Sequence, residues 1–380
     1  MGVTSAVLTA KHGCGFLAWE TAVTLPDGSP YRYHVPPQFP VLKDFVATMQ
    51  SAGLGYGFYY SLTNNFYVNA AAHNVRPPST LLPGQVNVTQ QQYEAIILAQ
   101  VTELWTQNGP LTEIWLDGGC GDLCDKVGAL VKSTLAKDAV AFNGGGGVSD
   151  HPVRWCGTEG GNPSGWPTVW STSACAPSWC PSGSGSGDAP NVSGAVWQPS
   201  GVDVTLQQGD RWFYMPGVPV HSLSDLAGFY HKSVGANGHL EIDFAIDRTG
   251  NVDPVHAARY AEFGAWIRGC YGAPVAAGSL PAGATSFSFA VPAGATFDRV
   301  MLEEDQTQGQ LIVAYTVEAL VGGAYVPFSA GVTVGSKRID VASAAVAGAT
   351  AVRVSVTQAF GVPAGLKASV FAPEPCVIAE

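Results

Sequence analysis

Hydrophobic positions in the first 275 residues follow two periods. Short apolar runs predict five strands, at Ser5–Ala10, Gly55–Tyr60, Glu113–Asp117, Ala139–Phe142 and Leu240–Ile246. Between them, residues spaced for one helical face predict helices at Pro40–Ala52, Thr89–Gln107 and Pro254–Cys270. The second helix opens with Thr89 and Gln92, which have the spacing of a capping box. Alternating strands and helices indicate parallel βαβ units and favour a (β/α)8 barrel of the TIM type.

A doubly wound parallel sheet is the alternative. It would carry a glycine fingerprint after its first strand, and the glycines of Lys11-His12-Gly13-Cys14-Gly15 have the wrong spacing for one.

The pattern changes after residue 275. Alternating runs such as Ser286–Val291, Leu311–Val317 and Ala351–Val356 are separated by Gly/Pro turns, which favours an antiparallel β-sandwich. We therefore predict a barrel domain at residues 1–275 and a sandwich domain at residues 276–380. Within the first, Ser182–Gly187 has the composition of a flexible linker inside a surface loop at Cys175–Pro190.

Composition narrows the function classes. The net charge is −11 with only 18 Lys and Arg residues, which argues against a nucleic-acid partner. No apolar run reaches the roughly 18 residues needed to span a membrane. Charged residues make up 12% of the chain, and the 46 glycines and 26 prolines indicate a protein rich in loops.

Eight cysteines favour disulfides and therefore an oxidising compartment, with cytosolic free thiols as the alternative. Cys120/Cys124 and Cys175/Cys180 have loop-like spacings without the partners of a zinc site. Two glycosylation triplets, at Asn87 and Asn191, agree with a secreted or lysosomal location. The chain opens without the features of a signal peptide. Either a leader lies outside this sequence, or the secretory interpretation is wrong.

Two carboxylates carry the candidate chemistry. Asp117 ends an apolar strand and is followed by two glycines, and Glu159 likewise precedes a glycine pair. A charge at the end of a buried strand is costly unless it is solvated, paired or used. Two such carboxylates beside aromatic residues indicate acid and nucleophile chemistry on a sugar. The alternative is that Asp117 caps the following helix and Glu159 is simply solvated.

Several blocks give the chain a resemblance to a known family. In order they are Leu8-Thr9-Ala10-Lys11-His12-Gly13-Cys14-Gly15-Phe16, Gly57-Phe58-Tyr59-Tyr60-Ser61, Glu113–Gly118, Val153–Gly161, Trp212-Phe213-Tyr214, Ser233-Val234-Gly235-Ala236-Asn237 and Val334-Gly335-Ser336-Lys337-Arg338. With these blocks the chain resembles the α-L-fucosidases of glycoside hydrolase family 29. The resemblance implies a barrel followed by a sandwich, and hydrolysis of α-L-fucosides with retention through a covalent fucosyl-enzyme.

The resemblance also implies roles for single residues. Asp117 matches the nucleophile, and Glu159 matches the acid/base of the branch with an R-W-x-G-x-E block. His12 is expected to bind fucose hydroxyls, and Tyr59 to lie beside the nucleophile. Trp115 points to the same strand face as Asp117 and is expected to wall the sugar pocket.

Arg154 and Trp155 belong to the acid/base block. A cation such as Arg154 near Asp117 would help to keep the nucleophile ionised. No cofactor and no metal are implied. The expected partner is a fucosylated glycan.

The chain departs from the family pattern in two places. Gly13 and Cys14 replace a His and an Asp of the K-H-H-D-G-F block. The segment that precedes this block in the family, with the first barrel strands, is also missing. Truncation of a longer protein is the first explanation. The others are a homo-oligomer or partner chain that completes the barrel, and a non-catalytic fucoside-binding or structural glycoprotein. A glycosidase for another sugar is a further alternative.

Other polar residues have plainer interpretations. His231 and His256 fall in helical patterns, and five histidines are predicted to be loop residues: His34, His73, His151, His221 and His239. Asp203 and Asp243 are rival carboxylates, and Asp243 falls inside the predicted strand Leu240–Ile246.

Overall fold

A computed structural model describes residues 2–143, 148–155, 159–161, 170–171, 196–197, 199–307, 309–363, 365–376 and 378. The chain divides into two compact units. The described part of the N-terminal unit is residues 3–143 and 148–155. That of the C-terminal unit lies within 156–173 and 181–380, together with Gly2. The predicted linker Ser182–Gly187 and the loop Cys175–Pro190 lie outside the described residues. The predicted domain boundary between residues 275 and 276 stays a prediction.

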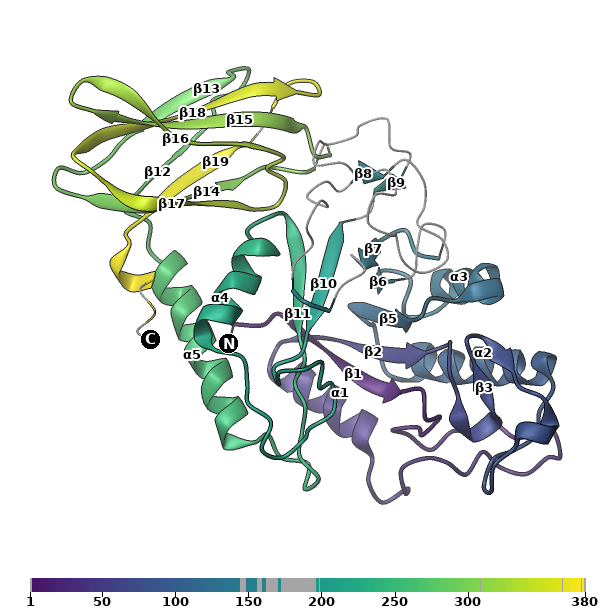
Figure 1. Ribbon diagram of the computed structural model, residues 1–380. Coiled ribbons are helices and arrows are strands. Elements are labelled where there is room, and N and C mark those ends of the chain that lie inside the picture. The colour runs from purple at the N-terminus through teal and green to yellow at the C-terminus, as the bar shows by residue number, and fades with distance from the viewer. Residues whose placement is uncertain are drawn as a thin grey trace. The chain divides into compact units, whose positions relative to one another are not determined.

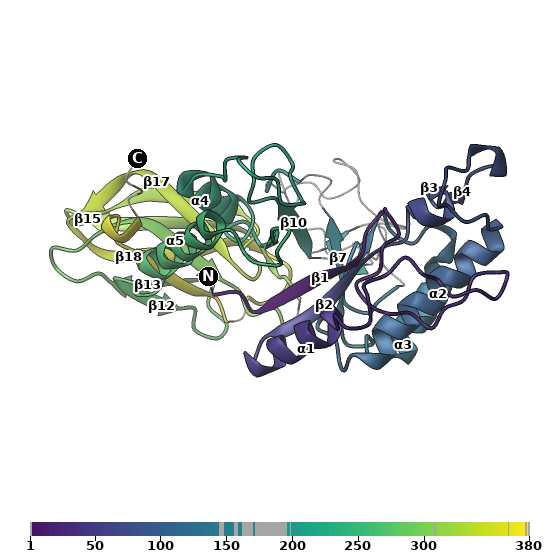
Figure 2. The same ribbon diagram turned by 90° about the horizontal axis from the view of Figure 1, so that it is seen from below.

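The N-terminal unit contains a parallel sheet. Its strands follow one another in chain order: β1 (Ser5–Lys11), β2 (Gly55–Ser61), β5 (Glu113–Asp117), β6 (Val140–Phe142) and β7 (Pro152–Trp155). Helices α1 (Val41–Ser51), α2 (Gln90–Gln107) and α3 (Cys124–Ser133) connect them. Shorter elements are η1 (Phe66–Val68), β3 (Ala70–Ala71), β4 (Asn74–Val75), η2 (Pro78–Thr80) and η3 (Gly121–Leu123). The helices lie on the same side of the strands (Figures 1 and 2).

The two faces of this sheet have different environments because side chains alternate along a strand. Phe58, Tyr60, Ile114 and Leu116 are buried in one core with residues of α1, α2 and α3. The opposite face carries a smaller cluster of buried residues, Trp115, Phe142 and Val153. A doubly wound sheet would have helices on both faces and a reversal of strand order, and the described strands of this unit show neither. The predicted barrel-type arrangement is therefore favoured over the alternative.

Helix α2 begins as its sequence predicts. The Thr89 hydroxyl accepts from the amide of Gln92, and the Gln92 side chain accepts from the amide of Thr89. Both bonds satisfy backbone donors of the first turn that have no partner within the helix.

The C-terminal unit begins with a second parallel arrangement. Strands β10 (Ser200–Val204) and β11 (Gly238–Ile242) pair in register, and helix α4 (Leu223–Lys232) lies between them in the chain. Helix α5 (Pro254–Tyr271) follows, and β8 (Trp170–Ser171) pairs with β9 (Val196–Trp197). The predicted strand Leu240–Ile246 was wrong in its bounds, because Ile242 is the last residue of β11 and Asp243 lies beyond it.

An antiparallel sandwich completes this unit, as predicted. One sheet has the order β12-β19-β14-β17 and the other β13-β18-β15-β16 (Figure 1). The strands are β12 (Ala276–Ser279), β13 (Ser286–Ala290), β14 (Thr296–Glu303), β15 (Ile312–Val321), β16 (Ala324–Val332), β17 (Arg338–Ala347), β18 (Ala349–Ala359) and β19 (Lys367–Phe371), followed by η4 (Glu374–Cys376). Their inward residues form one apolar core.

Helices α4 and α5 are tied to the sandwich. Ile339 of β17 belongs to the core formed by the two helices, and a disulfide joins Cys270 of α5 to Cys376. The side-chain oxygen of Asn237 also accepts from the amide of Ser336 at 2.7 Å. A second disulfide joins Cys120 to Cys124, so the prediction of disulfides is confirmed.

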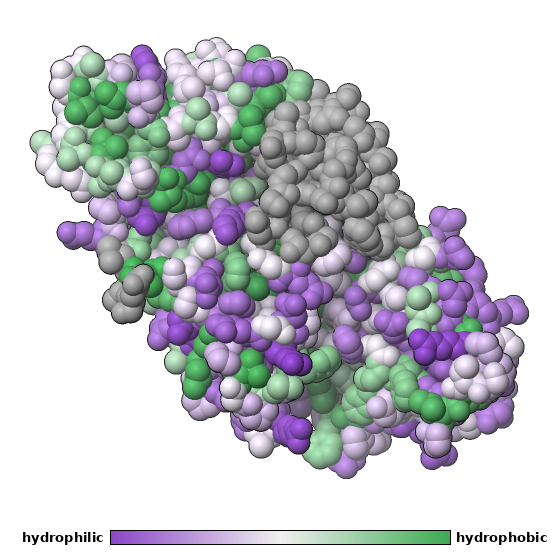
Figure 3. All heavy atoms as spheres, in the orientation of Figure 1, coloured by the Kyte–Doolittle hydropathy of each residue, from purple (hydrophilic) through white to green (hydrophobic). Residues whose placement is uncertain are grey.

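The face drawn in Figure 3 mixes hydrophilic and hydrophobic residues, as folded domains usually do. Among the described residues, no helix has both the length and the apolar character needed to cross a membrane.

Candidate active site

Asp117 is the last residue of β5 and is half-buried. It lies on the same strand face as Trp115, two residues earlier. Strand β2 pairs with β5 in parallel, with Tyr59 opposite Trp115 and Ser61 opposite Asp117. The Tyr59 hydroxyl donates to Asp117 Oδ2 at 2.5 Å. This hydrogen bond fixes one oxygen of the Asp117 carboxyl group relative to strand β2.

Aromatic rings extend from this carboxylate across the sheet. His12 stacks on Tyr59 with centroids 5.7 Å apart, and Tyr59 lies 5.4 Å from Trp115. Trp115 stacks in turn on Phe142 of β6, at 4.6 Å. Trp155 of β7 packs against the same cluster. Aromatic walls with a few polar groups are typical of small-molecule sites, and the structure therefore brings His12, Tyr59, Trp115, Asp117 and Trp155 together in one unit.

Lys11 lies close enough to Asp117 for their charges to interact, and it was not singled out from the sequence. Its side chain is fully buried, and Nζ donates to the carbonyls of Ser61 and Asn64, each at 2.5 Å. Burial lowers the pKa of Lys11 to about 7, while the charges of Cys14 and Asp117 act in the opposite direction. The available signal was a lysine at the end of an otherwise apolar strand.

Burial also lowers the pKa of His12, against the opposing effect of the Asp117 carboxylate. A neutral imidazole offers one donor and one acceptor, which suits hydrogen bonding to sugar hydroxyls.

Glu159 belongs to the C-terminal unit. Its side chain is exposed, and the indole nitrogen of Trp212 donates to Glu159 Oε2 at 3.0 Å. The neighbouring Gly160 forms an isolated antiparallel bridge with Val204, the last residue of β10. Glu159 therefore lies next to the carboxyl end of a parallel strand. Because Asp117 and Glu159 belong to different units, their pairing stays a prediction.

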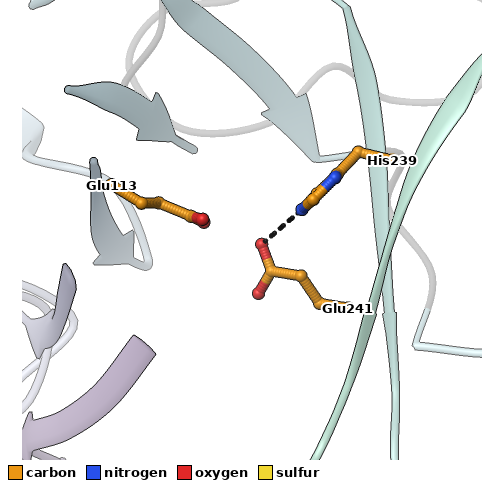
Figure 4. Close-up of side chains that lie close together, drawn as sticks. All are labelled: Glu113, His239 and Glu241. Carbon is orange, nitrogen blue, oxygen red and sulfur yellow. Dashed lines mark ion pairs between the residues drawn. The ribbon is translucent and has the colours of Figure 1, made fainter. Parts of the chain in front are cut away.

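The paired strands β10 and β11 carry further titratable side chains. His239 and Glu241 form an ion pair with Nε2 and Oε1 3.5 Å apart (Figure 4). Asp203 of β10, which is buried, lies opposite Glu241 in the ladder. His239 was predicted to be a loop residue, and this is wrong because β11 starts at Gly238, two residues before the predicted strand.

Asp243 follows β11 directly. Its Oδ2 is buried and finds no hydrogen-bond donor among the described residues. Burial raises the pKa of this carboxyl group to about 7.

Three further residues belong to the sequence blocks that carry the family resemblance: Gly13, Cys14 and Arg154. Cys14 is an exposed free thiol. A side chain at Gly13 would bring its Cβ to 3.2 Å from Asn64 Cβ, so a larger residue there requires Asn64 to give way. Arg154 belongs to β7. Its side chain is not among those that the structure describes, so its position near Asp117 stays a prediction.

Comparisons with known proteins show which family this chain resembles. A family model described as alpha-L-fucosidase matches residues 1–144. A candidate alpha-L-fucosidase of Oryza sativa subsp. japonica is 26% identical over 386 residues, which cover 89% of this chain and 68% of the rice protein. A candidate alpha-L-fucosidase structure from Bacteroides thetaiotaomicron superposes with a TM-score of 0.78 at 25% identity, covering 97% of this chain and 84% of the other. The chain is thus similar to the alpha-L-fucosidases of glycoside hydrolase family 29.

One more relative and one more solved structure agree with this likeness. Alpha-L-fucosidase 1 of Arabidopsis thaliana is 30% identical over 249 residues, which cover 62% of this chain and 43% of the plant protein. A Ruminococcus gnavus fucosidase of glycoside hydrolase family 29, solved with fucose, shares the fold with a TM-score of 0.76 at 19% identity, covering 99% of this chain and 84% of the other. The predicted resemblance to this family, the glycoside hydrolase class and the fold of a barrel-type part with a β-sandwich are confirmed.

Proposed function

We propose that this protein is a retaining exo-α-L-fucosidase that releases terminal α-L-fucose from glycans, with Asp117 as nucleophile and Glu159 as acid/base. The observation that carries the proposal is the carboxylate of Asp117. It closes a parallel strand, accepts a hydrogen bond from Tyr59 and lies beside a row of aromatic rings. The match of residues 1–144 to the alpha-L-fucosidase family model supports fucose as the sugar.

The first half of the reaction forms a covalent intermediate. An oxygen of Asp117 attacks the anomeric carbon as the bond to the leaving oxygen breaks, and Glu159 gives its proton to that oxygen. The hydrogen bond from Tyr59 keeps one oxygen of Asp117 in place and leaves the other for attack.

The second half hydrolyses this intermediate. Glu159, now ionised, takes a proton from water as the water oxygen attacks the anomeric carbon, and Asp117 is released as a carboxylate. A retaining enzyme requires the two carboxyl groups about 5–5.5 Å apart. The exposed position of Glu159 is compatible with exchange of the leaving group for water.

The remaining predicted residues bind the sugar. His12 lies against Tyr59 and is placed to hydrogen-bond hydroxyls, while Trp115 and Trp155 supply apolar surface for the pyranose ring. Arg154 is proposed as the cation that favours ionised Asp117.

The protein is further proposed to act in a secreted or lysosomal compartment, which the two disulfides support because such bonds persist in oxidising surroundings. We also propose a catalytic domain at residues 1–275 and a sandwich domain at residues 276–380. The expected homo-oligomer or completing partner chain stays a prediction.

A non-catalytic fucoside-binding protein is the second candidate. The observation that favours it is the exposed Cys14 beside Gly13, because the family block carries polar Asp and His side chains at these two positions. Loss of sugar contacts without loss of Asp117 or Glu159 would weaken the site selectively.

The test is hydrolysis of an aryl α-L-fucoside, with the configuration of the first-formed fucose followed by NMR. We expect α-fucose first, loss of turnover in Asp117→Ala, and rescue of that variant by azide as a fucosyl azide of inverted configuration. In Glu159→Ala, substrates with poor leaving groups should slow much more than activated ones. A folded wild-type chain that binds fucose without hydrolysing any aryl fucoside would establish the binding protein instead.

A further inference from the structure

The hairpin between β3 and β4 has an unusual tip. Its two loop residues, Ala72 and His73, both have positive φ, 50° and 65°. Two-residue hairpin loops of this type normally use asparagine or glycine, because other residues rarely adopt this conformation. The surroundings hold the tip in place, since the His73 amide donates to the Thr63 carbonyl at 2.8 Å and Gln90 Nε2 donates to the His73 carbonyl at 2.9 Å.

The ring of His73 contacts the turn that follows Asp117. Its Nε2 lies 3.1 Å from the carbonyl oxygen of Gly118, the residue directly after the carboxylate. Because a carbonyl only accepts, Nε2 carries a proton in this contact. A Cβ at Gly121 would lie 3.1 Å from the ring, so the turn also leaves room for the imidazole.

A second side chain holds the same turn. The Thr63 hydroxyl donates to the carbonyl of Asp117 at 3.0 Å. Gly118 has φ 70°, and a Cβ there would come within 1.6 Å of Thr63 Oγ1. Two successive carbonyls, those of Asp117 and Gly118, are thus each bound by a side chain from the segment between β2 and β4.

We propose that His73 is a positioning residue for the nucleophile. It holds the Gly118 carbonyl and thereby sets the direction in which the Asp117 carboxylate leaves β5, so the inference rests on the proposed role of Asp117. His73 touches neither the carboxylate nor, by this proposal, the substrate. A strained hairpin tip is retained because it delivers the imidazole to the turn.

The first experiment compares His73→Phe, His73→Gln and His73→Gly with the wild type on an aryl α-L-fucoside. Phe keeps a ring but no donor, and its kcat should fall about 10- to 100-fold with little change in KM, because small misplacements of a reacting group are costly. The Gln amide nitrogen replaces Nε2–H and should restore kcat to within a few-fold of wild type. Gly suits the positive φ, so it should lower kcat without lowering the melting temperature.

His34→Phe is the matched control. His34 is also a half-buried loop histidine of the N-terminal unit whose ring nitrogen contacts a carbonyl, that of Val35 at 2.7 Å. Its substitution should leave kcat unchanged.

The decisive measurement places His73→Phe in the Asp117→Ala background with azide as nucleophile. If His73 acts only through Asp117, the azide-driven rate should be the same with and without His73→Phe. An equal fall in both backgrounds, or wild-type kcat in the single Phe variant, would overturn the inference while leaving the proposed fucosidase activity intact. Failure of that activity is distinguishable, because then the wild type itself shows no turnover.

Discussion

Each of the two units has an aspartate at the carboxyl end of a parallel strand, and the surroundings of the two aspartates differ. Asp117 is the last residue of β5, and its Oδ2 accepts a hydrogen bond from the Tyr59 hydroxyl at 2.5 Å. Asp243 follows β11, and its Oδ2 has no donor among the described residues. Burial raises the pKa of Asp243 to about 7.

The difference shows that a place at the end of a parallel strand does not by itself fix the hydrogen-bond partners of a carboxyl group. At Asp243 desolvation outweighs the backbone hydrogen bond from Phe244, so the pKa rises and the carboxyl group keeps its proton to higher pH. The donor that distinguishes Asp117 comes from a neighbouring strand. A side chain 58 positions away in the sequence therefore decides which carboxylate is suited to the chemistry.

The largest expected effect comes from exchanging each aspartate for its amide. Asp117→Asn should lower kcat/KM for an aryl α-L-fucoside by about 10⁴-fold or more, because an amide cannot form the fucosyl-enzyme. Asp243→Asn should change it by less than about tenfold, because protonated Asp243 and asparagine are similar in shape and charge. A collapse of activity in Asp243→Asn, measured on protein of unchanged circular dichroism, would make Asp243 a rival acid to Glu159.

The same Asp243→Asn variant should alter stability in a pH-dependent way. The folded-state pKa is raised above the ordinary value of 3.8, so between about pH 4 and 7 the folded protein keeps a proton that the unfolded chain has released. The contribution of Asp243 to stability is therefore present at low pH and is lost as the pH rises through 7.

Relative to the variant, wild type should lose on the order of 2–4 kcal/mol between pH 4 and pH 8 in urea unfolding. A wild-type-minus-variant difference that stays constant with pH would show that Asp243 titrates normally.

Removing the donor to Asp117 tests the other side of the comparison. Tyr59→Phe keeps the ring that stacks on His12 but removes the hydroxyl. A charge-assisted hydrogen bond contributes about 1.5–3 kcal/mol, so kcat should fall about 10- to 100-fold. The control is Tyr33→Phe, a change of an exposed tyrosine in the same unit, which should have no effect on kcat. An unchanged kcat in Tyr59→Phe would mean that the bond does not orient the nucleophile.

The smallest effect is expected at Glu159. Trp212 donates from a half-buried indole to the exposed carboxyl group of Glu159, so Trp212→Phe should lower kcat/KM by about 2- to 10-fold. Because Glu159 is proposed to protonate the leaving oxygen, the loss should grow with the pKa of the leaving phenol. A series of aryl fucosides measures that slope. Equal losses across the series would separate Trp212 from proton transfer.

Local pattern predicted much of this molecule correctly. The strand ending at Asp117, the capping box of α2 and the antiparallel sandwich all agree with the structure. Each depends on neighbours a few residues apart, since side-chain periodicity and turn chemistry act over that range. The end of β11 was misplaced because apolar residues continue past Ile242, and a pattern does not show where strand pairing stops.

The sequence by itself determined the elements, the strand-end carboxylate and, through its motifs, the resemblance to the alpha-L-fucosidases. The family resemblance had placed Tyr59 beside Asp117, and only the tertiary structure showed which other side chains hold the turn that follows it. Tyr59, Thr63 and His73 reach Asp117 or its turn from other elements, and Lys11 is buried close to it. His73 in particular has the sequence surroundings of an ordinary loop residue. The physical reason is that hydrogen bonds and burial depend on distance in space, which strand pairing and packing set between residues far apart in the chain.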